Sequence, residues 1–101
     1  SMGADVYTAS KGGVVSLVRS FAKTYGRHNI LVNAVAPGQV NTPMQHVGLE
    51  PGVSEEMSKA CPLGRVSEPE EQASVAVFLA SDHASFINNS VINVSGGILG
   101  Y

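Results

Sequence analysis

The sequence has little of several features that would place a chain in a special class. Its 101 residues include one cysteine, Cys61, which excludes an intrachain disulfide and fits a reducing compartment. No apolar run approaches the roughly 20 residues that a membrane-spanning helix needs. The N-terminus also lacks a charged segment followed by a hydrophobic one. We therefore expect a cytoplasmic protein that makes no contact with membranes.

Charge of one sign is also scarce. Six basic and eight acidic residues leave a formal charge of -2, so the sequence lacks the basic face that a phosphate backbone requires. Nucleic acid is therefore not an expected partner. The three histidines, His28, His46 and His83, have no carboxylate or thiol at ligand spacing, so we expect solvated loop residues and no metal site.

The first half of the chain has the pattern of a helix followed by a strand. Between Thr8 and Tyr25 apolar residues recur at steps of three and four, which predicts an amphipathic helix that Gly26 ends. Residues 30–36 then form a short and almost unbroken apolar run, which Pro37 and Gly38 stop. Such a run is typical of a parallel strand covered on both faces.

The second half has the same order after a long loop. Residues 39–65 read as a loop that contains one short helix over residues 54–60. Ser67 and Glu70 have the spacing of a capping box, which predicts a helix through Ala80 that is apolar nearly all round and therefore largely buried. Residues 91–94 read as a second strand.

Two apolar strands joined through a helix form a βαβ unit, in which the strands pair in parallel with a right-handed crossover. The fold class is therefore α/β, in the order helix, strand, loop, helix, strand. A two-stranded parallel sheet has too many uncovered edges and faces to stand alone. We therefore expect the 101 residues to be part of a larger sheet.

Tyr7 and Lys11 stand four positions apart at the start of the first helix, so both side chains can project from one face. An ammonium group near a phenol favours the phenolate, which lets a phenol exchange protons with a carbonyl or hydroxyl oxygen. Protein side chains carry no hydride, so a redox role for this pair implies a nicotinamide cofactor. The spacing alone is also compatible with a solvated helix start.

Several motifs support the catalytic interpretation because they occur in a known order. The stretch YTASK at residues 7–11 resembles the Tyr-x-Ala-Ser-Lys signature of the short-chain dehydrogenase/reductase family. The stretch NAVAPGQVNTPM at residues 33–44 is similar to that family's sixth strand and the loop that receives nicotinamide. PLGR at 62–65, EPEE at 68–71, FLASD at 78–82 and VINVSGG at 91–97 resemble its closing elements. The resemblance covers nearly the whole chain.

The resemblance implies the C-terminal part of a doubly wound, Rossmann-like parallel sheet, with residues 1–101 as a fragment of a single domain. It also implies an oxidoreductase that moves hydride between NAD or NADP and a small-molecule alcohol or ketone. In this comparison Tyr7 is the general acid/base, and Lys11 binds the nicotinamide ribose. The residues further implied in cofactor binding are Pro37, Gly38, Val40 and Thr42, with residues 39–65 as a substrate lid.

The sequence also departs from the family pattern. The glycine-rich phosphate-binding turn has no counterpart, and too few residues precede Tyr7 to hold the family's catalytic serine. Residues 87–90 read INNS where Ile-Thr-Gly is usual, and Ser95 replaces an aspartate; neither change is expected to affect the chemistry. The choice between NAD and NADP and the identity of the substrate stay open.

Two other interpretations remain open. The chain could be a catalytically inactive fragment that self-associates through the open edge of the 30–36 strand and the apolar helix stripe, so a homo-oligomer is expected. An extended-type epimerase or dehydratase also uses tyrosine and lysine at this spacing. The Ala9-Ser10 context and the Gly96-Gly97 pair argue against that class.

Overall fold

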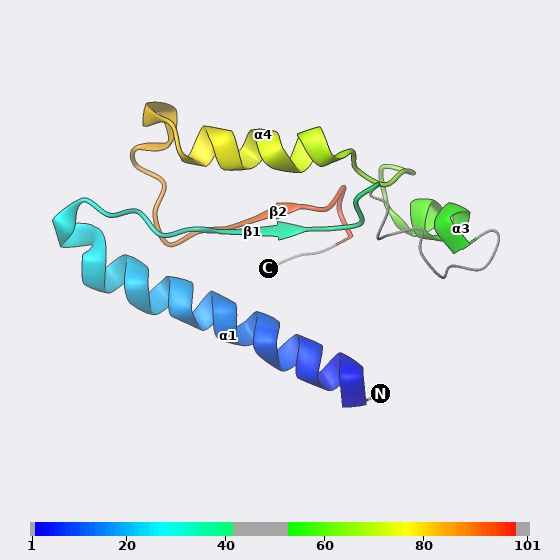
Figure 1. Cartoon of the computed structure of the whole chain (residues 1–101), viewed down its shortest axis with the longest axis horizontal. Helices are drawn as coiled ribbons and strands as arrows, with labels where there is room; N and C mark the ends of the chain where they lie inside the picture. Colours follow the sequence, from blue (N-terminus) through cyan, green and yellow to red (C-terminus); the bar gives the residue numbers. More distant parts are fainter. Residues whose placement is uncertain (1, 42–52, 99–101) are drawn as a thin grey trace. The chain divides into compact units, whose positions relative to one another are not determined.

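The computed structural model describes residues 2–41 and 53–98, and the expected α/β order is confirmed (Figure 1). The chain divides into two compact units. The first comprises residues 1–34 and 85–92, and the second comprises residues 35–84 and 93–101. The predicted lid falls largely on residues 42–52, which lie outside the described residues.

Helix α1 spans Met2–Tyr25 and begins earlier than the sequence pattern indicated. Its apolar stripe buries Val18 and Ala22, which are 7% and 2% exposed. The helix gives way to a 3-10 turn, η1, at Gly26–His28. Asn29 then takes a left-handed conformation, and its amide donates to the Gly26 carbonyl at 2.9 Å, which closes the turn.

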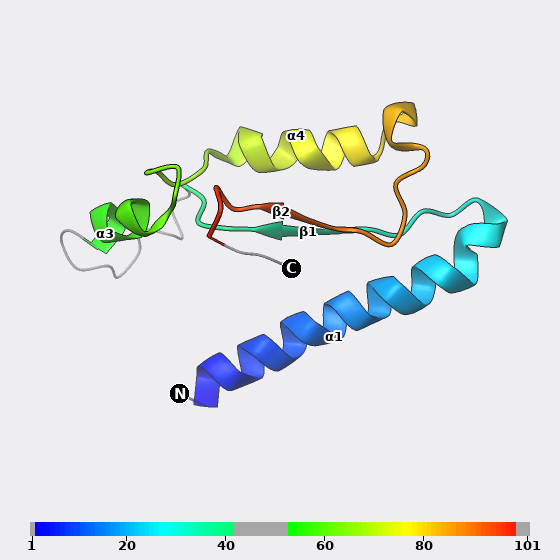
Figure 2. The ribbon, with the colours of Figure 1, turned by 180° about the vertical axis from the view of Figure 1, so that it is seen from behind.

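Strands β1 (Ala34–Pro37) and β2 (Val91–Val94) form a two-stranded sheet and lie side by side in both ribbon views (Figure 2). The Ala34 amide donates to Ser90, and the Gly38 amide donates to Val94. Both bonds join residues separated by 56 positions in the same direction, so the pairing is parallel, as predicted.

Strand β1 begins later than the expected residue 30, because asparagine side chains replace part of the backbone ladder. Asn88 Oδ1 accepts the Val32 amide at 2.9 Å, and Asn33 Oδ1 accepts the Ser90 amide at 3.0 Å. Asn88 Nδ2 also donates to the carbonyl of Ala22 at 3.3 Å. Residues 87–90 therefore connect the residues just before β1 with helix α1 within the first unit.

Helix α3 spans Val53–Ala60, close to the expected 54–60. Helix α4 spans Pro69–Leu79, and here the predicted capping box was wrong by one position. Glu68 is the N-cap, and its partner in the box is Glu71 rather than Glu70. The reason is Pro69, which has no amide proton and is favoured at the first helical position. A further 3-10 turn, η2, covers Asp82–Ala84.

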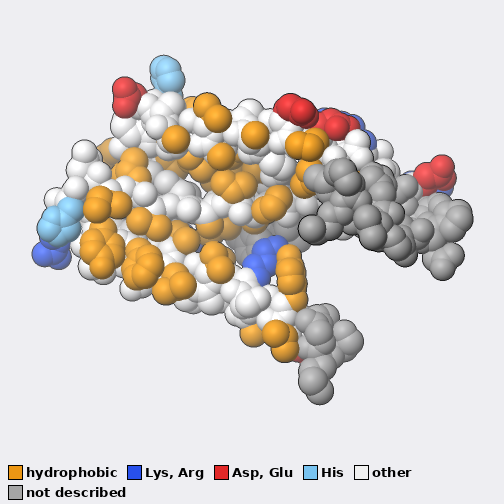
Figure 3. Space-filling view, in the orientation of Figure 1, with side chains coloured by type: hydrophobic (Ala, Val, Ile, Leu, Met, Phe, Trp, Pro, Cys, Tyr) orange, Lys and Arg blue, Asp and Glu red, His pale blue; other side chains and the backbone are white. Residues whose placement is uncertain are grey.

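The predicted burial of α4 was also wrong. No described residue of this helix is fully buried, and Val77 and Phe78 are 70% and 45% exposed. Apolar side chains show on the surface along α4 and, in the other unit, along α1 (Figure 3). A helix that is apolar all round needs cover on every side, and the described residues cover only the side toward the sheet.

Candidate active site

Tyr7 and Lys11 lie on the same face of α1. Lys11 Nζ is 5.9 Å from the centroid of the Tyr7 ring, within the range of a cation–π contact. Tyr7 is 66% exposed, so its hydroxyl is open to a ligand. Ser10 Oγ donates to the Tyr7 carbonyl at 2.9 Å, and this bond satisfies the hydroxyl within the helix. The pair therefore places an exposed phenol and an ammonium group side by side on one helix face.

The segment that follows β1 belongs to the second unit. Pro37 ends the strand, and Gly38 continues the ladder through its 3.1 Å bond to Val94. A Cβ atom on Gly38 would lie 2.9 Å from the Cα of Ser95, so only glycine allows the two backbones to approach this closely. Thr42 lies outside the described residues.

Val40 forms an isolated parallel bridge with Ser67, which lies just before α4. The Ser67 amide donates to the Gln39 carbonyl at 3.0 Å, and the Asn41 amide donates to the Ser67 carbonyl at 2.8 Å. The Ser67 hydroxyl donates to the same Gln39 carbonyl at 2.8 Å. Ser67 therefore holds the backbone on both sides of Val40.

This role of Ser67 was missed from the sequence, which predicted a helix cap instead. The signal was indirect, since with Pro69 at the first helical position the cap falls on Glu68 and leaves Ser67 free for another partner. Gln72 was missed as well. Its Nε2 donates to Ser67 Oγ at 3.1 Å and to the Val94 carbonyl at 2.8 Å, a contact that also places α4 against β2.

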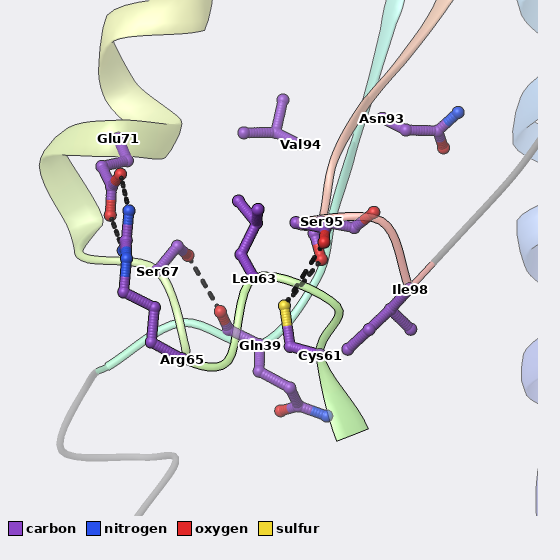
Figure 4. Close-up of a pocket in the computed structure, with 11 residues that line it drawn as sticks. Gln39, Cys61, Leu63, Arg65, Ser67, Glu71, Asn93, Val94, Ser95 and Ile98 are labelled. Atoms are coloured by element: carbon purple, nitrogen blue, oxygen red, sulfur yellow. Dashed lines mark hydrogen bonds and ion pairs between the residues drawn. The ribbon is translucent and has the colours of Figure 1, made fainter. Parts of the chain in front are cut away.

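A cavity of about 260 Å³ lies in the second unit beside this segment (Figure 4). Cys61 lines it and is buried, with its thiol 3.6 Å from the carbonyl oxygens of Ser95 and Gly96. A Cβ atom on Gly96 would lie only 2.5 Å from the Cys61 sulfur. The thiol therefore packs closely against the backbone of residues 95–96.

An ion pair borders the same cavity. Arg65 donates to the Glu71 carboxylate through both terminal nitrogens, at 2.6 and 2.8 Å. The Glu68 amide also donates to this carboxylate at 2.9 Å. The hydrogen bonds from Arg65 and from the Glu68 amide lower the pKa of Glu71 from 4.5 to about 2, and the carboxylate raises the pKa of Arg65. This pair fixes the loop that leads into α4.

The catalytic and cofactor-binding residues expected from the sequence thus fall in two groups. Tyr7 and Lys11 come together in the first unit, whereas Pro37, Gly38 and Val40 come together in the second.

Among the described residues, no group of His, Cys, Asp or Glu side chains could hold a metal ion. Across residues 2–41 and 53–98, no helix has both the length and the apolar character needed to cross a bilayer.

Comparison with known proteins extends over nearly the whole chain. A sequence profile described as enoyl-(acyl carrier protein) reductase matches residues 1–99. The chain is 44% identical over 93 residues to the 3-oxoacyl-(acyl-carrier-protein) reductase of Thermotoga maritima, and this match covers 92% of the chain and 37% of that protein. It is 47% identical over 91 residues to cis-4-hydroxycyclohexanecarboxylate dehydrogenase of Sinomonas cyclohexanicum, covering 90% of the chain and 36% of that protein.

The fold has a counterpart in a crystal structure of a short chain dehydrogenase family protein from Francisella tularensis subsp. tularensis SCHU S4. The TM-score is 0.83 and the sequence identity 31%, with 91% of this chain and 42% of that chain covered. The chain spans little more than a third of the length of the curated relatives named above. The similarity therefore reaches both units but leaves most of each relative unmatched.

Proposed function

Because this chain belongs to the short-chain dehydrogenase/reductase family, we propose that it is part of an oxidoreductase that reduces a carbonyl or oxidises a hydroxyl group with NAD or NADP. Residues 1–101 would then be the C-terminal portion of a single Rossmann-like domain. The observation that carries the proposal is the Tyr7–Lys11 pair, in which an exposed phenol and an ammonium group share one helix face.

In the proposed reaction Tyr7 is the general acid/base. Its hydroxyl donates a proton to the substrate carbonyl oxygen as hydride reaches the adjacent carbon, which yields the alcohol and leaves a phenolate that solvent protonates again. In the reverse direction the phenolate accepts the hydroxyl proton. The Lys11 ammonium stabilises that phenolate and binds the ribose hydroxyls. A bound nicotinamide supplies or takes up the hydride.

The backbone around Val40 supports the nicotinamide part of the proposal. The Gln39 carbonyl and the Asn41 amide both face Ser67. In a trans peptide the carbonyl and the amide proton point in opposite directions, so the Val40 amide and carbonyl face away from Ser67. They offer one donor and one acceptor on the same side, which complements a primary carboxamide.

Pro37, Gly38 and Thr42 complete the proposed nicotinamide-binding segment. Pro37 ends β1, Gly38 bonds to Val94, and the chain then brings residue 40 beside Ser67. The part played by Thr42 rests on the family resemblance alone. The relatives' names include a reductase and a dehydrogenase for different molecules, so the proposed substrate class is a small carbonyl or hydroxyl compound.

A segment exchange tests this function. This chain would replace the matching portion of the Thermotoga maritima reductase, and the rate of that protein's own reaction would be measured. We expect Tyr7→Phe to lower kcat by about 10²- to 10⁴-fold, the range for loss of a general acid/base. Tyr25→Phe is the matched control, because it removes a hydroxyl from the other end of the same helix and should leave kcat unchanged. Full activity of the Tyr7→Phe chimera would refute the assignment.

The exposed apolar surface favours a second candidate function, in which the isolated chain is inactive and self-associates. Val77 and Phe78 are exposed on α4, as are Leu17 and Phe21 on α1. Such surfaces are normally covered in a stable assembly. Sedimentation velocity at micromolar concentration should show a dimer or larger species, and a monomer would contradict this candidate.

Val77→Glu tests which surface drives the association. This change should shift the chain toward the monomer, because it places a charge where the candidate interface would exclude water. Ser74→Glu is the control on the same helix, since Ser74 is exposed but already polar. Equal effects of the two substitutions would show that added charge alone, rather than loss of the apolar surface, changes the association.

A further inference from the structure

Gln39 is held by a residue far along the chain. Its carbonyl accepts a hydrogen bond from the Ser67 amide at 3.0 Å. It accepts a second from the Ser67 hydroxyl at 2.8 Å, which is drawn in Figure 4. The Ser67 carbonyl accepts the amide of Asn41 at 2.8 Å. Three bonds from one residue therefore fix the peptide groups before and after Val40.

The Ser67 hydroxyl is itself oriented by Gln72. Gln72 Nε2 donates to Ser67 Oγ at 3.1 Å, so the serine proton is left to point at Gln39. The other proton of the same amide nitrogen goes to the Val94 carbonyl at 2.8 Å, which also accepts the Gly38 amide. Both side chains are half-buried, where competition from water is reduced. The network connects α4, the end of β2 and the segment after β1.

We propose that Ser67 is a positioning residue for the cofactor carboxamide and that Gln72 holds its hydroxyl in place. This inference rests on the proposed nicotinamide site at Val40. The Gln39 carbonyl and the Val40 amide belong to one rigid peptide plane, so rotation of that carbonyl turns the Val40 donor with it. Without the hydroxyl, the plane keeps a single hydrogen bond, from the Ser67 amide, and ligands bearing a carboxamide lose a preorganised partner.

The test follows the backbone amides of Val40 and Asn41 by ¹⁵N NMR in the chimera described above, in which this chain replaces the matching portion of the Thermotoga maritima reductase. The probe is nicotinamide mononucleotide, and nicotinic acid mononucleotide is the comparison, since it has a carboxylate in place of the carboxamide. We expect saturable shifts at Val40 in the millimolar range with the first compound and weaker binding of the second, because a carboxylate cannot donate to the Val40 carbonyl.

Ser67→Ala should weaken binding of nicotinamide mononucleotide by about three- to tenfold, the effect of one lost hydrogen bond. Ser67→Thr keeps the hydroxyl and should restore most of the affinity. Ser74→Ala is the matched control, because it removes a serine hydroxyl of α4 that donates to the Glu71 carbonyl at 3.2 Å and makes no bond to Gln39. It should leave both the shifts and the affinity unchanged.

The outcomes separate the two proposals. If the unaltered chimera shows no saturable shift at Val40, the proposed nicotinamide site fails and the positioning role fails with it. If the unaltered chimera binds and its Ser67→Ala variant binds equally well, the positioning role alone is overturned. Gln72→Glu gives a second reading should Ser67→Ala not fold, because a carboxylate cannot donate to Ser67 Oγ; undiminished binding there would also overturn the inference.

Discussion

The packing of Gly96 against Cys61 gives the sharpest prediction for stability. Gly96 has a φ of 65°, and an added Cβ would lie 2.5 Å from the Cys61 sulfur. Gly64 has a φ of 79° with nothing within 4 Å of such an atom. Gly64→Ala therefore measures the backbone cost alone, about 1–2 kcal/mol. Gly96→Ala adds the overlap with sulfur, about 1–3 kcal/mol more, because the buried sulfur or the backbone must shift to admit the methyl group.

The measurement is the free energy of unfolding, from urea titrations followed by far-UV circular dichroism. A double-mutant cycle with Cys61→Ala isolates the contact, because the shortened side chain leaves room for the new methyl group. In that background Gly96→Ala should cost no more than Gly64→Ala. If Gly96→Ala is no more destabilising than Gly64→Ala in the unaltered chain, the reasoning about close packing is refuted.

Two further predictions concern single contacts. The bonds from Arg65 and the Glu68 amide depress the pKa of Glu71 to about 2, so their stabilising effect is complete above pH 4.5 and is lost as the pH falls toward 2. In Arg65→Met the free energy of unfolding, measured by urea titration, should change less between pH 4.5 and pH 2. Asn89 has a φ of 62° and accepts Arg19 Nη1 at its side chain, so Asn89→Ala should cost about 1–2 kcal/mol in the free energy of unfolding and Asn89→Gly less.

The elements that could be predicted from the sequence are those set by local pattern. Strand β2 matches residues 91–94 as expected, and α1 follows its apolar spacing up to the glycine that ends it. The start of β1 was wrong by four positions, because Asn33 and Asn88 satisfy backbone groups that a strand would otherwise pair. Side-chain bonds that take the place of backbone bonds in this way depend on partners far away in the chain, so they leave no local signal in the sequence.

For the candidate site, the helical spacing of Tyr7 and Lys11 was enough to predict that the two side chains share one helix face, and the structure confirms this. The supporting residues were less accessible to sequence reasoning. Ser67 fits a cap equally well by spacing, and only the proline two positions later favours the alternative. Gln72 carries no pattern at all, since its contacts with Ser67 and Val94 exist only after the strands have paired.

The parallel register has a consequence for how the chain folds. Every hydrogen bond between β1 and β2 joins segments separated by more than fifty positions, whereas α1 is held by contacts within each turn. The helix can therefore form early and alone, whereas the pairing of β1 with β2 must await residues 91–94. During synthesis β1 emerges more than fifty residues before β2, so the edge of β1 that β2 covers stays unpaired and aggregation-prone over that interval.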